Sequence, residues 1–278
     1  MIYIENEILK VSINFKGALL TSIIDKRNKE ELLYQVEKDS WPFQDVQIFP
    51  VIGATNYKVN NFKLSSPTRH GFIRNMDFKI SSLKDDFVEL KIKSNEETKK
   101  LYPYDFEFKI SYKLDFDKLI VSTKIINLSS EELLCMYGSH TAIKANEEAT
   151  LELGKGFTQY KLVDGLISLN ETNILDSKIK LTKDYFKKED TVVIKNIFND
   201  LKLKNGFNHE IIYSFDATLF ALWSRNDNGE FVCLEPWWGI SNISNEEIKL
   251  SDTKYINKVK KEKEFTYSLT FKLSSNHQ

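Results

Sequence analysis

The sequence predicts an all-β protein, a large antiparallel β-sandwich formed by a single domain over residues 1–278. Apolar and polar residues alternate over several stretches, as they do in strands with one buried face. No segment carries a long apolar repeat at helical spacing, and only 183–189 could form a helical turn or two, so a parallel sheet with crossover helices is not expected. No Pro/Gly/Ser-rich linker divides the chain, and 278 residues suit one large β domain.

The strongest alternation predicts a strand over 106–116, where the apolar set begins at Phe106 and ends at Phe116. A turn-like stretch leads into a second alternating run over 119–125, so the two form an antiparallel hairpin. The C-terminal run 265–273 repeats the pattern. Shorter strands are expected at 8–15, 19–25, 78–83, 87–93, 151–153, 211–215 and 231–235.

A continuous apolar run predicts the centre of the fold. Residues 214–224 are uninterruptedly apolar after Asp216, as in a strand covered on both faces. Cys135 and Cys233 lie in similar apolar runs, where cysteine acts as a small hydrophobic side chain, so no disulfide is expected.

Net charge and composition limit the classes of molecule that the protein is expected to bind. Acidic residues number 40 and basic residues 39, so no strong field attracts nucleic acid or an anionic membrane. We expect a small, mostly uncharged ligand and either a monomer or a homodimer, since near-zero net charge permits self-association. The N-terminus has no signal-like pattern, and no apolar run approaches the ~18 residues that span a membrane, which predicts a cytoplasmic protein.

Two of the four histidines lie in dense motifs: His70 in Arg69-His70-Gly71-Phe72-Ile73-Arg74, and His140 in Gly138-Ser139-His140-Thr141. His209, in a polar turn, and His277, near the end of the chain, are expected to be solvated and without function.

Arginine is scarce in this chain, yet Arg69 and Arg74 both flank His70. Their placement suggests a need for a planar fork of donors that lysine cannot supply. Surface ion pairs beside a turn are an equally good interpretation of the two residues.

A second motif is Glu235-Pro236-Trp237-Trp238-Gly239, which holds two of the four tryptophans. A carboxylate that ends an apolar strand among aromatic rings tends to have a raised pKa, which suits a general base near neutral pH. Aromatic faces also suit the CH face of a pyranose. The alternative is a core Trp pair with a strand-end glutamate in a salt bridge.

The spacing of these residues argues against other chemistries. No His-x-His, HExxH or paired-cysteine pattern supports a metal site. A glycosidase needs two facing carboxylates, and Glu235 has no evident partner. No Gly-x-Ser-x-Gly elbow suggests a serine nucleophile.

These motifs, taken in order, resemble the aldose 1-epimerase (galactose mutarotase-like) family, in particular its LacX-like bacterial branch. The resemblance spans nearly the whole chain. Its segments are 17–23, the segment at Trp41, 49–53, 70–74, 138–140 and 235–239. It implies a large antiparallel β-sandwich, in agreement with the alternation above.

The resemblance also implies roles. Glu235 matches the family's general base, His140 its general acid, and His70 a second histidine near the ring oxygen; Asp190 resembles an acidic residue that binds sugar hydroxyls. Arg69, Arg74, Trp237 and Trp238 are the remaining candidates for sugar binding. Mutarotation removes a proton from the anomeric hydroxyl and gives one to the ring oxygen, so it needs no cofactor or metal.

The chain departs from the family at two points. Where relatives usually carry an arginine that grips the sugar, it has Gly53-Ala54-Thr55-Asn56, and the common His-Pro-Ala-Phe is His140-Thr141-Ala142-Ile143. The first expectation is an epimerase of a free aldohexose. Two alternatives stay open, a non-catalytic sugar sensor and a hexose-6-phosphate epimerase, for which Arg69 and Arg74 would supply the positive charge.

Overall fold

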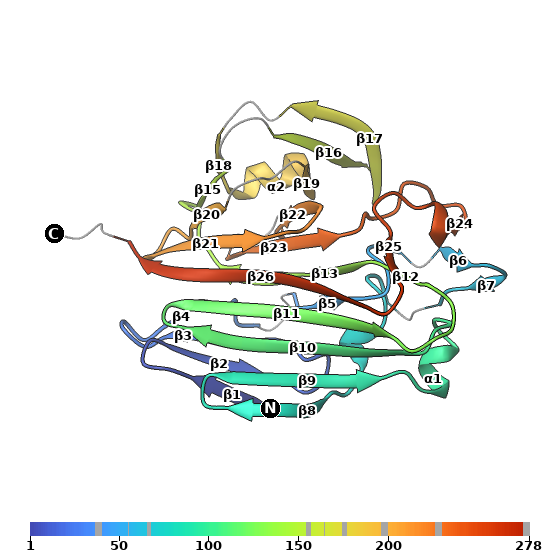
Figure 1. The fold of residues 1–278 in the computed structure, drawn as a ribbon. Coiled ribbons are helices and arrows are strands. Elements are labelled where there is room, and N and C mark those ends of the chain that lie inside the picture. Colours follow the sequence, from blue (N-terminus) through green and yellow to red (C-terminus); the bar gives the residue numbers. More distant parts are fainter. Residues whose placement is uncertain are drawn as a thin grey trace.

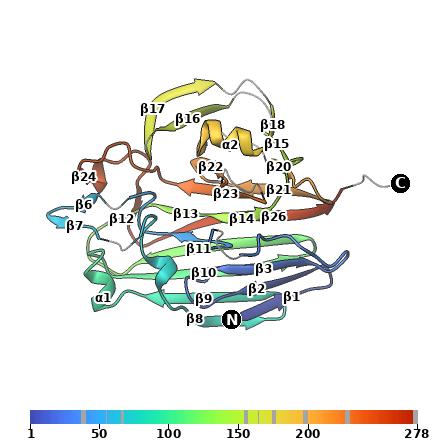
Figure 2. The same cartoon turned by 180° about the vertical axis from the view of Figure 1, so that it is seen from behind.

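The structure, a computed structural model, describes residues 1–36, 41–54, 56–65, 68–153, 157–163, 165–173, 177–195, 200–225 and 230–274. Within these ranges the chain is built almost entirely from antiparallel sheets, which lie in layers against one another (Figures 1 and 2). One cluster of buried apolar side chains runs through them from Ile4 to Phe271. The antiparallel β-sandwich predicted from the alternation is therefore confirmed.

A nine-stranded sheet forms one side of the described molecule. In spatial order its strands are β18 (Lys178–Lys180), β15 (Thr150–Glu152), β20 (Leu201–Lys204), β21 (His209–Phe215), β26 (Glu262–Leu273), β11 (Lys118–Asn127), β10 (Phe106–Asp115), β9 (Phe87–Lys93) and β8 (Lys79–Lys84). β10 and β11 form the predicted hairpin, with register from Phe106↔Asn127 to Asp115↔Lys118.

A second sheet carries the central apolar strands. Its order in the described chain is β17 (Leu166–Asn173), β16 (Thr158–Val163), β19 (Val192–Lys195), β22 (Leu219–Trp223), β23 (Phe231–Trp238), β13 (Tyr137–Ser139) and β5 (Gln47–Ile48), and β14 (Thr141–Lys144) also pairs with β23. All eight residues of β23 are buried, and neighbouring strands flank it on both edges.

Smaller elements complete the fold. A four-stranded sheet contains β1 (Ile2–Glu5), β2 (Leu9–Ile13), β3 (Leu20–Asp25) and β4 (Glu30–Glu31); β12 (Leu133–Cys135) pairs with β25 (Asn257–Val259); and β24 (Ile248–Lys249), β6 (Tyr57–Val59) and β7 (Phe62–Lys63) form a third group. The helices described are α1 (Glu96–Lys99), α2 (Lys183–Glu189) and the 3-10 turns η1 (Ile73–Asn75) and η2 (Leu250–Asp252). α2 occupies the predicted helical segment.

Three details of the strand prediction were wrong at the ends of runs. Phe116 is 78% exposed with a φ of 52°, because it lies in the turn between β10 and β11. Leu273 is 43% exposed at the end of β26. The run 214–224 is not one strand: β21 ends at Phe215 and β22 begins at Leu219, and β22 is the part that lies centrally.

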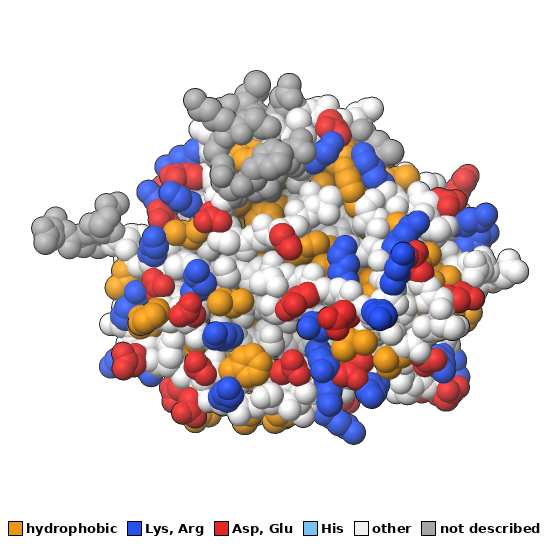
Figure 3. Space-filling model, in the orientation of Figure 1, with side chains coloured by type: hydrophobic (Ala, Val, Ile, Leu, Met, Phe, Trp, Pro, Cys, Tyr) orange, Lys and Arg blue, Asp and Glu red, His pale blue; other side chains and the backbone are white. Residues whose placement is uncertain are grey.

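Surface and core chemistry agree with the composition. Acidic and basic side chains intermingle on the face shown in Figure 3, so neither sign dominates it. Cys135 and Cys233 are buried and free, as predicted. No helix in the described ranges is both long enough and apolar enough to cross a membrane.

Candidate active site

Strand register brings His140 and Glu235 together. β14 pairs Thr141 with Leu234 and β13 pairs Gly138 with Trp237, so His140, between those strands, lies opposite Glu235 on β23. Side chains directly opposite each other on adjacent strands point to the same face. Nε2 of His140 is accordingly 3.3 Å from Oε1 of Glu235. Nearly a hundred residues of sequence separate two groups that the sheet places in contact.

His70 reaches the same place from a loop. Its φ is 68°, in the left-handed region that non-glycine residues rarely occupy. Gly71 follows with a φ of 75°, and a Cβ there would lie 2.0 Å from the carbonyl oxygen of Phe49. Only glycine permits this close docking of the loop. The His70 and His140 rings are then 6.0 Å apart between centroids, nearly perpendicular.

A hydrogen bond fixes the tautomer of His70. The backbone N–H of Gly53 donates to Nδ1 across 3.3 Å, so that nitrogen is an acceptor. Burial and the nearby positive charges of Arg69 and Arg74 hold the His70 pKa well below its usual value, so the ring is neutral. Its single proton is therefore on Nε2, which can only donate.

The three residues line one cavity of about 420 Å³, large enough for a monosaccharide. Its lining is largely aromatic and polar. The full set is Trp41, Phe43, Arg69, His70, Arg74, His140, Leu162, Gly165, Asp190, Thr191, Trp223, Glu235, Trp237 and Ser241.

Two tryptophans enclose the His140 ring. Trp41 stacks on it with ring centroids 5.0 Å apart and planes at 24°, and Trp223 meets it edge-on at 5.8 Å. Nδ1 of His140 is buried without a hydrogen-bond partner in the described structure. The ring is thus oriented by packing and by its contact with Glu235.

Burial drives the pKa values of this pair apart. The Glu235 side chain is 2% exposed, and burial raises its pKa to about 8, although the Trp237 N–H partly opposes the shift. Burial, aided by the charge of Arg74, lowers the His140 pKa to about 3. At neutral pH the pair therefore holds one proton to share, and its uncharged form is favoured.

The predicted binding residues lie at the rim. Arg69 is exposed, whereas Arg74 is half-buried with its guanidinium carbon 5.3 Å from the Phe43 ring centroid. Burial lowers the Arg74 pKa, and its Nε has no hydrogen-bond partner among the described residues. Asp190 is the C-cap residue of α2, with a φ of 54°, and its N–H donates to the carbonyl oxygen of Phe186 at 2.8 Å.

Among the described residues, neither arginine forms an ion pair with Asp190 or with any other carboxylate.

The adjacent tryptophans separate, as alternation along a strand requires. Trp237 lines the cavity, and its Nε1–H donates to Oε2 of Glu235 at 3.2 Å. Trp238 does not line the cavity: it stacks on Tyr137 at 5.4 Å, and its Nε1–H donates to Asp216 at 2.9 Å. The prediction that Trp238 binds substrate is therefore corrected, because its indole belongs to the core.

His209 also differs from its prediction. It begins β21 instead of lying in a solvated turn, and it is fully buried. Nε2 lies 2.9 Å from Asp25 and Nδ1 lies 3.0 Å from Glu30, and none of these three residues lines the cavity. Because its neighbours in sequence are polar, the sequence did not indicate that His209 begins a buried strand. His277 lies outside the described residues.

The turn at Ala54 is held away from the acid–base pair. Its N–H donates to the side-chain oxygen of Asn242, which also donates to Asn56 through its amide. Ala54 is not among the residues that line the cavity. Thr55, in the same turn, lies outside the described residues.

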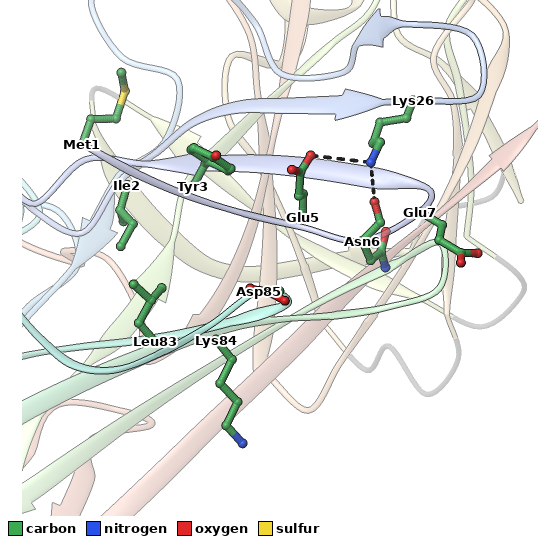
Figure 4. Close-up of a pocket in the computed structure, with 10 residues that line it drawn as sticks. All are labelled: Met1, Ile2, Tyr3, Glu5, Asn6, Glu7, Lys26, Leu83, Lys84 and Asp85. Atoms are coloured by element: carbon green, nitrogen blue, oxygen red, sulfur yellow. Dashed lines mark hydrogen bonds and ion pairs between the residues drawn. The ribbon is translucent and has the colours of Figure 1, made fainter.

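A larger cavity of about 920 Å³ lies elsewhere, between β1 and the β8–β9 turn. Figure 4 shows its lining, in which Lys26 binds Glu5 and the backbone oxygen of Asn6. The lining includes no histidine and no buried carboxylate, so size alone does not mark a reactive site here. Among the described residues, no group of three or more His, Cys, Asp or Glu side chains is arranged to hold a metal ion.

Sequence reasoning missed several cavity residues, above all Trp41 as a partner of His140 and Trp223. The scarcity of tryptophan was the available signal, because three of the four in the chain line this cavity. Leu162, Gly165, Thr191 and Ser241 carried no such signal.

Comparison with known proteins agrees with this architecture. A family model described as aldose 1-epimerase matches residues 1–269. The chain therefore belongs to the aldose 1-epimerase family, and membership implies an enzyme of the isomerase class.

Individual relatives cover nearly the whole chain. The chromosomal LacX protein of Lactococcus lactis subsp. lactis is 26% identical over 290 aligned positions, covering 93% of this chain and 94% of LacX. A galactose mutarotase related enzyme from Lactobacillus acidophilus is 26% identical with a TM-score of 0.90, covering 99% of this chain and 98% of that one. A galactose mutarotase-like protein from Lactobacillus casei, at 22% identity and a TM-score of 0.91, covers 98% of this chain and 100% of its own, and shows the shared fold.

Proposed function

We propose that this protein is an aldose 1-epimerase that interconverts the α and β anomers of an aldohexose. One observation carries the proposal: an imidazole nitrogen and a carboxylate oxygen lie 3.3 Å apart in a cavity large enough for one sugar ring. Their pKa values lie on either side of neutrality, so the pair keeps one proton available for transfer.

The proposed reaction uses that proton on two oxygens of one carbon. Once the shared proton has moved from Glu235 to His140, the Glu235 carboxylate removes the proton from the anomeric hydroxyl and His140 gives its proton to the ring oxygen, so the bond between C1 and the ring oxygen breaks. Because both oxygens are bonded to C1, one bond angle apart, two groups in contact can serve both. The aldehyde rotates and the ring closes on its other face, with the two roles exchanged.

Other residues support this scheme. Nε2–H of His70 donates toward the sugar, and the Trp237 indole offers an apolar face beside Glu235. Asp190 and Arg74, at the rim, face the sugar hydroxyls. The scheme uses no cofactor and no metal.

Polarimetry on freshly dissolved α-glucose and α-galactose tests the proposal, with the spontaneous rate subtracted. Glu235→Gln should still bind sugar by calorimetry but lose about 10²–10⁴-fold in rate. His140→Asn should lose a similar factor, and the double variant far less than the product, because acid and base act as one unit. Glu262→Gln, an exposed position, is the matched control and should retain the wild-type rate.

Binding without turnover would identify the protein as a sugar sensor and not as an enzyme. If the wild type shows no rate above background on any aldose while calorimetry detects binding, the protein binds sugars without turning them over. If neither rate nor binding is found with free sugars, the substrate class must be reconsidered.

One observation favours a second candidate, epimerisation of a phosphorylated aldose. Arg69 and Arg74 both line the cavity, and neither has a carboxylate partner among the described residues. Burial lowers the pKa of Arg74, so its charge is held at a cost that an anion would offset. Guanidinium groups bind phosphate through paired hydrogen bonds.

Glucose 6-phosphate and glucose should be compared at low and high salt. If the phosphorylated sugar is the substrate, its kcat/KM exceeds that of glucose and falls with ionic strength. Arg74→Gln should remove this preference, whereas Lys113→Gln, an exposed charge on β10, should not. Equal or better turnover of free glucose would leave the first candidate in place.

A further inference from the structure

A second buried carboxylate lies behind the His140 strand. Asp45 has no exposed surface and is outside the cavity lining. Its Oδ2 accepts from the Leu20 N–H and from Nε2 of Gln47, both at 3.1 Å. Its Oδ1 accepts from the Thr141 hydroxyl at 2.9 Å and from the Ser139 hydroxyl at 3.5 Å. The aspartate thus joins β3 to the strands that carry His140.

No lysine, arginine or histidine in the described ranges forms an ion pair with Asp45. Its ionisable neighbours include tyrosines from four strands, and the Ser139 hydroxyl continues the network to the Tyr267 hydroxyl at 2.8 Å. A buried carboxylate without a cation is costly, and an apolar side chain in its place would cost less. Its presence calls for a reason other than stability.

The residues on either side of His140 in the sequence both belong to the Asp45 network. Ser139 and Thr141 flank it, and because side chains alternate along a strand, they point to Asp45 while His140 points into the cavity. Val46, the residue after Asp45, exchanges two backbone hydrogen bonds with His140, at 2.9 and 3.1 Å. Asp45 therefore holds both the strand that bears His140 and the strand beside it.

This backbone support matters because few hydrogen bonds orient the His140 ring itself. A catalytic histidine is commonly oriented by a hydrogen bond to its second nitrogen, but Nδ1 of His140 is buried without one in the part of the chain that the structure describes. The distance from Nε2 to Glu235 is consequently set by where the backbone lies and by the Trp41 and Trp223 rings.

We propose that Asp45 is a positioning residue of the active site: through Ser139, Thr141 and Val46 it fixes the backbone of His140, and so the separation of the acid from the base. The inference rests on the proposed role of His140. Asp45 does not line the cavity, so its contribution should fall on the chemical step and not on substrate binding.

Asp45→Asn tests this with little change of shape, because the amide nitrogen cannot accept from two of the four donors. We expect kcat to fall about 10–100-fold with KM nearly unchanged. In the His140→Asn background the same substitution should produce no further loss of rate. Asp45→Glu and Thr141→Val should give intermediate losses, since each disturbs only part of the network.

Asp25→Asn is the matched control. Asp25 is equally buried and bonded to His209 and Arg27, but it has no contact with the cavity. It should lower the melting temperature as Asp45→Asn does while leaving kcat unchanged. A rate loss of equal size in both variants would show a general effect of destabilisation and overturn the proposal.

Histidine-ring NMR separates this inference from the proposed function, because the chain has only four histidines. Asp45→Asn should move the ring resonances of His140 and leave those of His209 in place, whether or not any sugar is turned over. Unmoved His140 resonances, or a full rate loss retained in the His140→Asn background, would overturn the positioning role even if the epimerase is real.

Discussion

The backbone N–H of Gly53 donates to Nδ1 of His70, which makes His70 a fixed hydrogen-bond donor toward the cavity. We expect His70→Asn to fold, because asparagine tolerates the left-handed backbone at this position. The variant loses the Nε2–H donor at the sugar, so kcat should fall about 10²–10³-fold. Polarimetry and a melting curve measure both effects. A variant that keeps its full rate would exclude His70 from the reaction.

The shared proton of Glu235 and His140 predicts the pH profile. The active pair holds one proton; it gains a second below about pH 3, where His140 is protonated, and loses its proton above about pH 8, where Glu235 ionises. After subtraction of the spontaneous reaction, kcat/KM should be level between about pH 4 and 7 and decline above 8. A rate that rises from pH 7 to 9 would mean that the carboxylate acts without a proton from its partner.

Trp237→Phe should move the alkaline decline. Its Nε1–H donates to Glu235 and stabilises the carboxylate, so removing it raises the Glu235 pKa further. The decline should shift to higher pH by about one unit. Trp238→Phe is the matched control, because that indole donates to Asp216 instead. If both variants shift the profile alike, the hydrogen bond is not the cause.

The buried Glu235 should also make stability depend on pH. Its pKa is raised from 4.5 to about 8 on folding, so the unfolded chain ionises first. Between these values the native state loses stability relative to the unfolded state as pH rises, and the loss is complete above 8. Glu235→Gln lacks this loss.

The free energy of unfolding of Glu235→Gln should therefore exceed that of the wild type by an amount that grows from pH 5 to 8, up to about 4 kcal/mol. Urea titrations at pH 5, 6.5 and 8 measure it. A difference that stays constant with pH would show that Glu235 is already ionised when folded.

Much of the fold could be predicted because alternation reports burial directly. The residues from Phe106 to Leu114 that alternate in sequence are the ones buried in β10. The prediction failed where an alternating run ends, since the apolar character of Phe116 does not indicate that it lies in a turn. Nor could polar neighbours reveal that His209 is held by Asp25 and Glu30 from distant strands.

The candidate site was accessible through rare residues in unusual contexts, namely His70, His140 and Glu235. What the sequence could not supply is register. That His140 stands opposite Glu235 follows from pairing Thr141 with Leu234, and a slip by one residue would turn the imidazole to the other face. The stacking of Trp41 on His140 is likewise a contact between remote segments.

The hydrogen bond between Ala54 and Asn242 fixes a turn that does not itself line the cavity. The acid and base belong to core strands, whereas this turn is anchored to the segment that follows β23. A replacement at position 54 therefore leaves His140 and Glu235 in place, because strand pairing sets their separation. The departure from the family's usual arginine at this turn thus leaves the proposed acid–base pair undisturbed.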